Sequence, residues 1–339
     1  MENRKGIISA GNWIVDYVKI IDRFPSENML ANILDVYKSV GGGPNNVLTD
    51  LSKMKVDIPL YGAGLVGDDA DGDYILNQMD KNGINKDYMQ RTSALPTSFT
   101  DAMSVMDTGN RTFFHYRGAN AQLKVEHLVD VNADAKIFHL AYLLLLDELD
   151  SEDLDYGVKA ARLLQHIRDK GYETSIDVVS EEGERFKKVV GPCLQYVDYL
   201  IINEIEAAAI SGISLREEGK IEVEKVKEAA LKLIRLGVNE LVVIHCPEGA
   251  CLVDTNDKIV WMSSWNVDTS EIVGATGAGD AFCAGCLYAI HEGWPYEKVL
   301  QLGHTSARFN LMEATATGGA VTLTEMEEFM ATDVPLTTI

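Results

Sequence analysis

The residues with the clearest capacity for chemistry are three glycines that run into an aspartate, in the sequence GATGAGD at positions 274–280. The small and apolar residues that follow, from Ala281 to Ile290, predict a buried helix, so the glycines form the loop that opens it. The first amide groups of a helix have no partner within it, and the helix dipole places partial positive charge beside them. This turn is therefore predicted to bind an anion such as a phosphate.

Asp280 is the unusual member of this segment, because a carboxylate beside an anion site repels a phosphate. The chemistry that fits is removal of a proton from a hydroxyl that attacks that phosphate. Gly274 and Gly279 have the Walker A spacing, but an aspartate and an alanine occupy the places of its Lys and Ser/Thr. A dinucleotide fingerprint belongs near the start of a domain. A tight turn without chemistry is the remaining alternative, and Asp280 argues against it.

This stretch resembles the second signature of the ribokinase-like (PfkB-type) carbohydrate kinases, in which Gly-Ala-Gly-Asp closes the motif. The resemblance implies that Asp280 is the catalytic base. It also implies an anion hole made by the backbone amide groups of Gly277, Ala278 and Gly279. Thr276 is then a nucleotide contact.

Gly274 departs from the family pattern, which usually has an aspartate at this position. In relatives of ribokinase that aspartate helps to hold a monovalent cation. The departure puts potassium activation in doubt, whereas the resemblance implies ATP and Mg²⁺ as the nucleotide and its metal ion.

A second glycine-rich stretch, GGGPNN at positions 41–46, cannot continue a strand and is followed by helical spacing. An asparagine at a helix start offers donors and an acceptor to a hydroxyl group. The stretch is similar to the first family signature, and the resemblance implies that Gly42, Gly43 and Asn46 contact the sugar. Asp16 follows a predicted strand at 6–12 and matches a sugar-binding aspartate of the family, with an ordinary turn aspartate as the alternative.

The residues expected to bind the nucleotide match the family motifs less closely than those expected to bind the sugar. Asn203 and Glu206 resemble an Asn-x-x-Glu element of the family, which implies that Asn203 positions phosphates and that Glu206 holds Mg²⁺ through water. Capping of the following helix is the alternative for Asn203 and can hold at the same time. The family motif Thr-x-Gly-x-x-Gly-Ala is reduced here to Gly249 and Ala250. The resemblance carries Gly249 and His304 over as nucleotide contacts and leaves the base of the donor open.

A β-sheet lid is implied by the resemblance over about residues 13–38 and 97–118. The second segment has turn residues between two β-rich runs, which predicts a hairpin. Residues 18–37 show no sustained period of their own. Arg117 in the hairpin is a candidate for binding a phosphate or an acidic sugar, with an ordinary surface arginine as the alternative. A lid that pairs with a second lid would make a homodimer.

The remainder of the chain alternates strands and helices, which predicts a parallel sheet covered on both faces. With the resemblance, we expect residues 1–339 to form one ribokinase-like domain: a three-layer α/β/α fold with a mainly parallel sheet and a small β-sheet lid. Ligands then bind beyond the carboxyl ends of the strands. The expected strands are Ala135–Leu140, Thr174–Val178, Tyr199–Ile202 and Glu240–Ile244, and the expected helices lie around Leu154–Lys170, Ile205–Ile210 and Glu222–Leu236.

Composition restricts the partners. The formal net charge is -22, with 52 acidic against 30 basic residues. This balance argues against nucleic acid and anionic membranes, which both bind basic patches. A phosphate ligand then needs Mg²⁺ and a local positive potential. The five cysteines form no spacing pattern and no long apolar run or signal peptide is evident, so we expect a cytoplasmic protein.

The combined interpretation is an ATP-dependent kinase of a sugar hydroxyl. A nucleoside is the alternative acceptor, and a sugar-binding sensor without catalysis is the alternative outside enzymes. A Rossmann oxidoreductase is more distant. The sequence does not select among sugars, so ribose, fructose and ketodeoxygluconate all remain open as acceptors.

Overall fold

One large sheet forms the centre of the molecule in the computed structural model, which describes residues 4–180, 185–332 and 334–337. Its strands lie in the order β17-β16-β15-β12-β11-β8-β1-β4-β5. From β15 to β5 all neighbours are parallel, and β16 and β17 add antiparallel pairs at one edge. The bounds are β1 Gly6–Gly11, β4 Leu60–Gly67, β5 Asn85–Thr92, β8 Ala135–Leu143, β11 Glu173–Val178, β12 Tyr199–Asn203, β15 Leu241–Cys246, β16 Gly249–Asp254 and β17 Ile259–Ser263.

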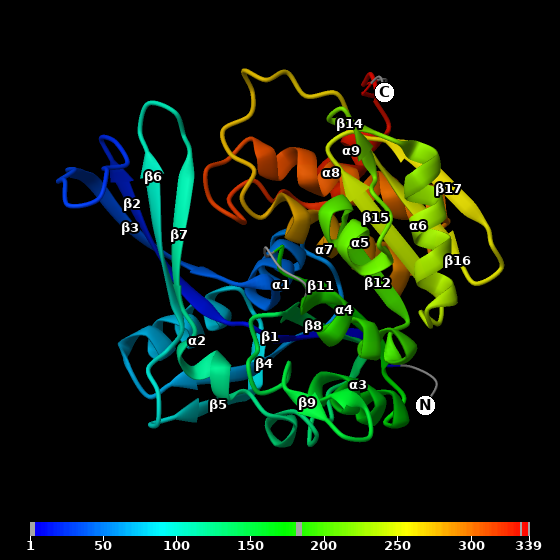
Figure 1. Ribbon diagram of the computed structural model, residues 1–339, viewed down its shortest axis with the longest axis horizontal. Coiled ribbons are helices and arrows are strands. Elements are labelled where there is room, and N and C mark those ends of the chain that lie inside the picture. The colour runs from blue at the N-terminus through cyan, green and yellow to red at the C-terminus, as the bar shows by residue number, and fades with distance from the viewer. Residues whose placement is uncertain (1–3, 181–184, 333, 338–339) are drawn as a thin grey trace.

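Helices cover both faces of this sheet (Figure 1). Strand β1 is buried along its whole length, and its neighbouring residues Ile7 and Ile8 belong to two different apolar clusters. This is the pattern of a parallel strand with both faces covered. The cluster of Ile7 includes α1 Gly43–Lys53, α2 Ala70–Lys81, α7 Ala278–His291, α8 Tyr296–Leu311 and α9 Leu323–Met330, and that of Ile8 includes α3 Lys159–Asp169, α4 Arg185–Val189, α5 Glu204–Ser211 and α6 Val223–Arg235. The three-layer α/β/α prediction is confirmed.

A second sheet, the lid, has the strand order β3-β2-β6-β7 and extends away from the main sheet (Figure 1). Strands β2 and β6 are parallel, and the outer pairs are antiparallel. Residues 18–37 therefore contain regular strand, although no period is visible there, because much of β3 is exposed on both of its faces. The bounds are β2 Ile14–Ile21, β3 Ile33–Gly41, β6 Phe99–Val105 and β7 Arg111–Tyr116.

The helix expected around Leu154–Lys170 begins later than predicted. Its first part is a turn, in which the Asp153 carboxylate accepts backbone hydrogen bonds from Asp155 and Tyr156, each 3.1 Å long. Helix α3 starts only at Lys159. Side-chain bonds of this kind give the backbone an alternative to helix. Two short antiparallel strand pairs precede helices. They are β9 Glu152–Asp153 with β10 Gly157–Val158 before α3, and β13 Arg216–Glu217 with β14 Lys220–Ile221 before α6.

The other expected strands and helices differ from the observed elements by one to three residues at their ends. The described part of the chain holds no helix long and apolar enough to cross a membrane.

Candidate active site

Asp280 lies in the first turn of α7, directly after the glycine-rich loop. Gly277 precedes the helix with a φ of 80°, and a side chain there would collide with the Ala316 carbonyl, so only glycine fits. The side chain of Asp280 is 6% exposed. Burial raises the pKa of its carboxyl to about 6, against hydrogen bonds from Tyr142 and Asn46 that lower it. The carboxyl group in the first turn of α7 is therefore mainly ionised at neutral pH, and of the neighbouring amides that of Ala278 donates to the Ala275 carbonyl at 3.3 Å.

The neighbours of Asp280 come from distant parts of the chain. Asn46 Nδ2 of α1 donates to Asp280 Oδ2 at 2.8 Å, and the Tyr142 hydroxyl at the end of β8 donates to Oδ1. Helix α1 begins at Gly43 with Gly42 at its cap, so the first signature and the second meet at two helix N-termini. Each of the two hydrogen bonds fixes the orientation of the carboxylate.

Asp16 of β2 lies near Asp280, whose charge raises its pKa. Burial is the larger cause, and together they bring the pKa of Asp16 to about 7, while Arg111 opposes the shift. A side chain at Gly41 would overlap the Asp16 carboxylate, which explains why the loop begins with glycine. The lid thus contributes a carboxyl group to the same region as the base.

The lid arginine that reaches the glycine-rich loop is Arg111, not Arg117. Arg111 Nη1 donates to Thr276 Oγ1, and its Nη2 donates to the Ala314 carbonyl at 2.7 Å. Arg117 Nη1 instead donates to the Leu144 carbonyl and to Asp147, both at 2.9 Å. Strand β7 ends at Tyr116, so Arg117 belongs to the turn that leaves the lid. Arg117 as a contact for a phosphate or an acidic sugar stays a prediction, and the hydrogen bonds of Arg111 make it a second candidate for that role.

Two cavities meet at this point. The larger, of about 580 Å³, lies between the ends of β12 and β15 and the helices α7 and α8, and His304 and Ala278 line it. The smaller, of about 370 Å³, contains the Asp280 carboxylate. Three residues line both cavities: Asn203, His245 and Gly279. Gly249 lines neither of these two, because it lies in β16 against Trp261 and Met262.

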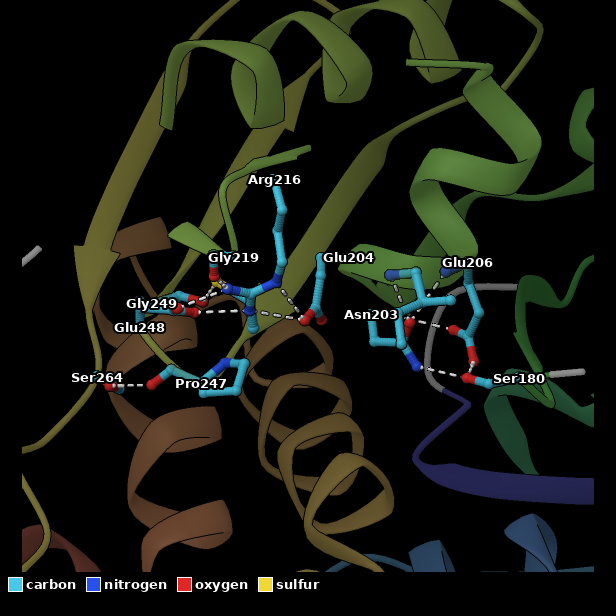
Figure 2. A network of polar contacts seen from close by, with 12 residues as sticks. Ser180, Asn203, Glu204, Glu206, Arg216, Gly219, Pro247, Glu248, Gly249 and Ser264 are labelled. Atoms are coloured by element: carbon cyan, nitrogen blue, oxygen red, sulfur yellow. Dashed lines mark hydrogen bonds and ion pairs between the residues drawn. The ribbon is translucent and has the colours of Figure 1, made fainter. Parts of the chain in front are cut away.

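Asn203 and Glu206 form a reciprocal cap at the start of α5 (Figure 2). Asn203 Oδ1 accepts from the Glu206 amide, and Glu206 Oε2 accepts from the Asn203 amide, both at 3.0 Å. Ser180 donates to Glu206 Oε1 at 2.8 Å. Burial raises the pKa of Glu206 to about 7. The capping alternative is therefore present in the structure, and both side chains also border the smaller cavity.

Residues 5–322 match the family described as pfkB family carbohydrate kinase. The chain belongs to this family. Among similar proteins, ribokinase of Arabidopsis thaliana is 25% identical over 89% of this chain and 74% of its own length. Adenosine kinase of Schizosaccharomyces pombe is 27% identical over 71% of this chain and 70% of its own length.

Solved structures show the same fold. A ribokinase from Thermotoga maritima superposes with a TM-score of 0.78 at 23% identity, over 97% of this chain and 100% of that one. The Arabidopsis thaliana ribokinase complexed with ribose and ATP gives a TM-score of 0.77 at 20% identity, over 97% and 99%. At these identities the likeness concerns the fold.

Several residues at the site of this pfkB-family chain were not selected from the sequence: Tyr142, Asp177 and Arg111. Tyr142 and Asp177 both lie where a parallel strand reaches its carboxyl end, β8 and β11. Because ligands bind at that edge, a polar side chain there was an available signal. Asp177 lines the smaller cavity, and burial together with the charges of Glu206 and Asp280 raises its pKa.

Proposed function

We propose that this chain catalyses ATP-dependent phosphorylation of a sugar hydroxyl. The observation that carries the proposal is the Asp280 carboxylate, held by Asn46 and Tyr142 at a helix N-terminus where two cavities meet. A group that takes a proton and a group of amides that binds a phosphate are both required when a hydroxyl attacks a phosphoryl group. The geometry supplies them side by side.

The acceptor is assigned to the side of Asp16, Gly42, Gly43 and Asn46. Asp280, ionised at neutral pH, takes the proton from the acceptor hydroxyl. The amides of residues 278–280 stabilise charge on the transferring phosphoryl group. Asn46 uses its amide to hold the base, so its contribution includes orienting Asp280 as well as binding the sugar.

The phosphoryl donor is assigned to the larger cavity, with Asn203 and His304, which line it, as contacts. Thr276 of the adjoining glycine-rich loop is a further proposed contact, although it lines neither cavity. Mg²⁺ fits this set of carboxyl groups. Burial raises the pKa values of Asp177, Glu206 and Asp280, the charge of Asp280 raises those of Asp177 and Glu206 further, and a nearby cation would offset both effects. Among the described residues, no three or more His, Cys, Asp and Glu side chains are arranged to hold a metal ion directly. We propose that Glu206 contacts Mg²⁺ through water. Bound Mg²⁺ neutralises charge on the nucleotide phosphates.

A nucleoside is the second candidate acceptor, since relatives of similar identity include adenosine kinase. A sensor that binds sugar without catalysis remains the alternative outside enzymes, and the intact base and helix terminus argue against it. We assign the protein to the cytoplasm, where ATP is available and its five free cysteines stay reduced.

The test is ADP release with Mg-ATP in the presence of ribose, fructose, 2-keto-3-deoxygluconate, tagatose, hexose phosphates, inosine and adenosine. Asp280→Asn is the blank. Turnover with one acceptor that disappears in the variant supports both the chemistry and the acceptor. Silence with every acceptor, together with sugar binding in a thermal shift, favours the sensor. Repeating the assay on the active acceptor with and without K⁺ tests whether potassium activates the enzyme, which has Gly274 where the family usually has an aspartate.

We also propose that the lid pairs with the lid of a second copy. Strand pairing places Ile33, Val36 and Phe114 on the lid face opposite to Asp16, and these side chains are 52–55% exposed. The edge strand β3 borders this face, and an edge strand offers unpaired backbone groups to another strand. A second copy would cover the apolar face and the edge together.

Sedimentation of the wild type against Val36→Lys measures this pairing. A dimer that becomes a monomer in the variant, with an unchanged melting temperature, is the expected result. A wild type that sediments as a monomer at every concentration would contradict it.

A further inference from the structure

His245 occupies the junction between the two cavities. It is the penultimate residue of β15, and in the sheet it lies opposite Asn203, the last residue of β12. Together with Asn203 and Gly279, it lines both the donor cavity and the cavity of Asp280. A phosphoryl group that moves from donor to acceptor has to pass this boundary.

The fold holds the imidazole ring beside the helix that carries the base. The ring packs on Phe282 of α7, with ring centres 4.7 Å apart and an angle of 32° between the planes. A Cβ atom at Gly279 would lie 3.5 Å from His245 Cε1. The ring edge is therefore next to the backbone of the proposed anion hole.

The ring nitrogens of His245 are open to the cavities. Within residues 4–180, 185–332 and 334–337, no side chain or carbonyl hydrogen bonds to them. His304, which also lines the larger cavity and packs on Phe282, differs, because its Nε2 lies 3.2 Å from the Met262 carbonyl. Burial lowers the pKa of His245 to about 4, and the nearby His304 adds to the effect. The neutral ring presents one N–H donor and one acceptor.

We propose that the imidazole N–H of His245 donates a hydrogen bond to phosphate oxygens of the phosphoryl donor at the junction of the two cavities. The inference rests on the proposed function. Phosphate oxygens only accept hydrogen bonds, so an N–H donor with no other partner matches them. The ring keeps its proton throughout, because Asp280 accepts the proton of the acceptor hydroxyl. With Gly249 and Ala250 closing the family motif, Ile244 takes the place of its threonine and His245 the unspecified position after it, so the motif itself assigns no role to His245.

The experiment distinguishes the effect of the ring N–H group on nucleotide binding from the effect of the packing of the ring. His245→Phe retains an aromatic contact with Phe282 but has no donor, and His245→Asn retains a donor on a shorter side chain. Binding of Mg-ATP and of its non-hydrolysable imido analogue is measured by calorimetry, and turnover is measured with the acceptor found in the panel. Donor affinity or kcat/KM for ATP should fall roughly 10- to 100-fold in the Phe variant, the usual effect of losing a hydrogen bond to a charged group. The Asn variant should recover part of the loss.

The outcomes distinguish this inference from the proposed function. A Phe variant with wild-type donor affinity and kcat/KM would show that His245 only packs, and would overturn the inference. A wild type that binds no Mg-nucleotide would overturn the proposed function instead. His245→Met, which fills a similar volume without a donor, takes the place of the Phe variant if that variant melts at a lower temperature than the wild type. KM for the acceptor should be unchanged in all three.

Discussion

The acceptor side and the donor wall of the cavities are built in different ways. On the acceptor side, two helix N-termini meet, and Asn46 of one donates directly to Asp280 of the other. The donor wall is the side of the larger cavity formed by the cap of α5 and the end of β15. The hairpin of β13 and β14 supports this wall from outside. There Arg216 joins Glu204 to Glu248 by ion pairs of 2.8 and 2.7 Å (Figure 2).

The two sides differ in the direction in which the protein shifts the pKa of their carboxyl groups. Burial raises the pKa of the carboxyl groups on the acceptor side, so each binds a proton more readily near neutral pH than an exposed carboxylate does. On the donor wall, hydrogen bonds from Arg216 lower the pKa of Glu248, and its charge is neutralised within the protein. We therefore expect changes on the acceptor side to reduce the rate, and changes on the donor wall to reduce donor affinity by smaller factors.

The largest effect is expected for Asp280→Asn. The variant keeps the shape of the side chain but removes the base, so kcat should fall on the order of 10²–10⁴-fold. Acceptor binding measured by calorimetry should be retained. Glu248→Gln makes the same change of charge on the donor wall and should alter kcat by less than about threefold. Equal losses in the two variants would contradict the comparison.

Arg111→Met is expected to rank second. Arg111 links the lid to Thr276 and to the Ala314 carbonyl, so its loss should free the lid from the anion hole. We expect kcat/KM to fall about 10- to 100-fold, measured by coupled ADP release.

Arg117→Met is the matched control, since its partner Asp147 is 51% exposed and such pairs contribute little. We expect less than a twofold change. If Arg117→Met lost more activity than Arg111→Met, the original sequence prediction for Arg117 would be the better one.

Tyr142→Phe should shift the pH dependence. The hydroxyl donates to Asp280 and lowers its pKa, so removing it raises that pKa further above the ordinary value. The base acts when ionised, and activity therefore decreases at low pH. The acid limb of kcat/KM, near pH 6 in the wild type, should move up by about one unit. Activity at pH 8 should remain within about threefold of the wild type, and an unshifted acid limb would remove Tyr142 from this role.

The acceptor side could be predicted from the sequence because its geometry is encoded locally. Glycines at positions 41–43 and 277 set backbone conformations that permit close approach, and the helices start directly after them. Tyr142 carries no such local signal for its contact with Asp280, although its place near the end of β8 marks it as a candidate. It lies in an apolar run, and its partner Asp280 is 138 residues away in the chain.

The two lid arginines show the same limit within one hairpin. Arg111 and Arg117 are six positions apart in the chain, so strand alternation alone places both side chains on one face. β7 ends at Tyr116, so Arg117 leaves the strand, and only Arg111 contacts the glycine-rich loop. Where the strand ends depends on how the lid rejoins the core, which the local sequence does not specify. The donor wall was the least predictable region because Arg216 reaches it from a hairpin that matches no motif.

The smallest effect is expected for Arg216→Met, which tests the donor wall directly. Arg216 is 30% exposed and its two pairs are worth about 1 kcal/mol together, so the donor KM should rise about two- to fivefold with kcat unchanged. Arg91→Met is the matched control, because Arg91 also pairs with two carboxylates, Asp68 and Asp73, but neither partner lines a cavity, whereas Glu204, a partner of Arg216, lines the larger one. Its donor KM should equal that of the wild type. Since salt screens exposed pairs, the difference between wild type and Arg216→Met should shrink at high ionic strength. A fall in kcat with an unchanged donor KM would mean that Arg216 serves the chemical step, and the division between the two sides would be wrong.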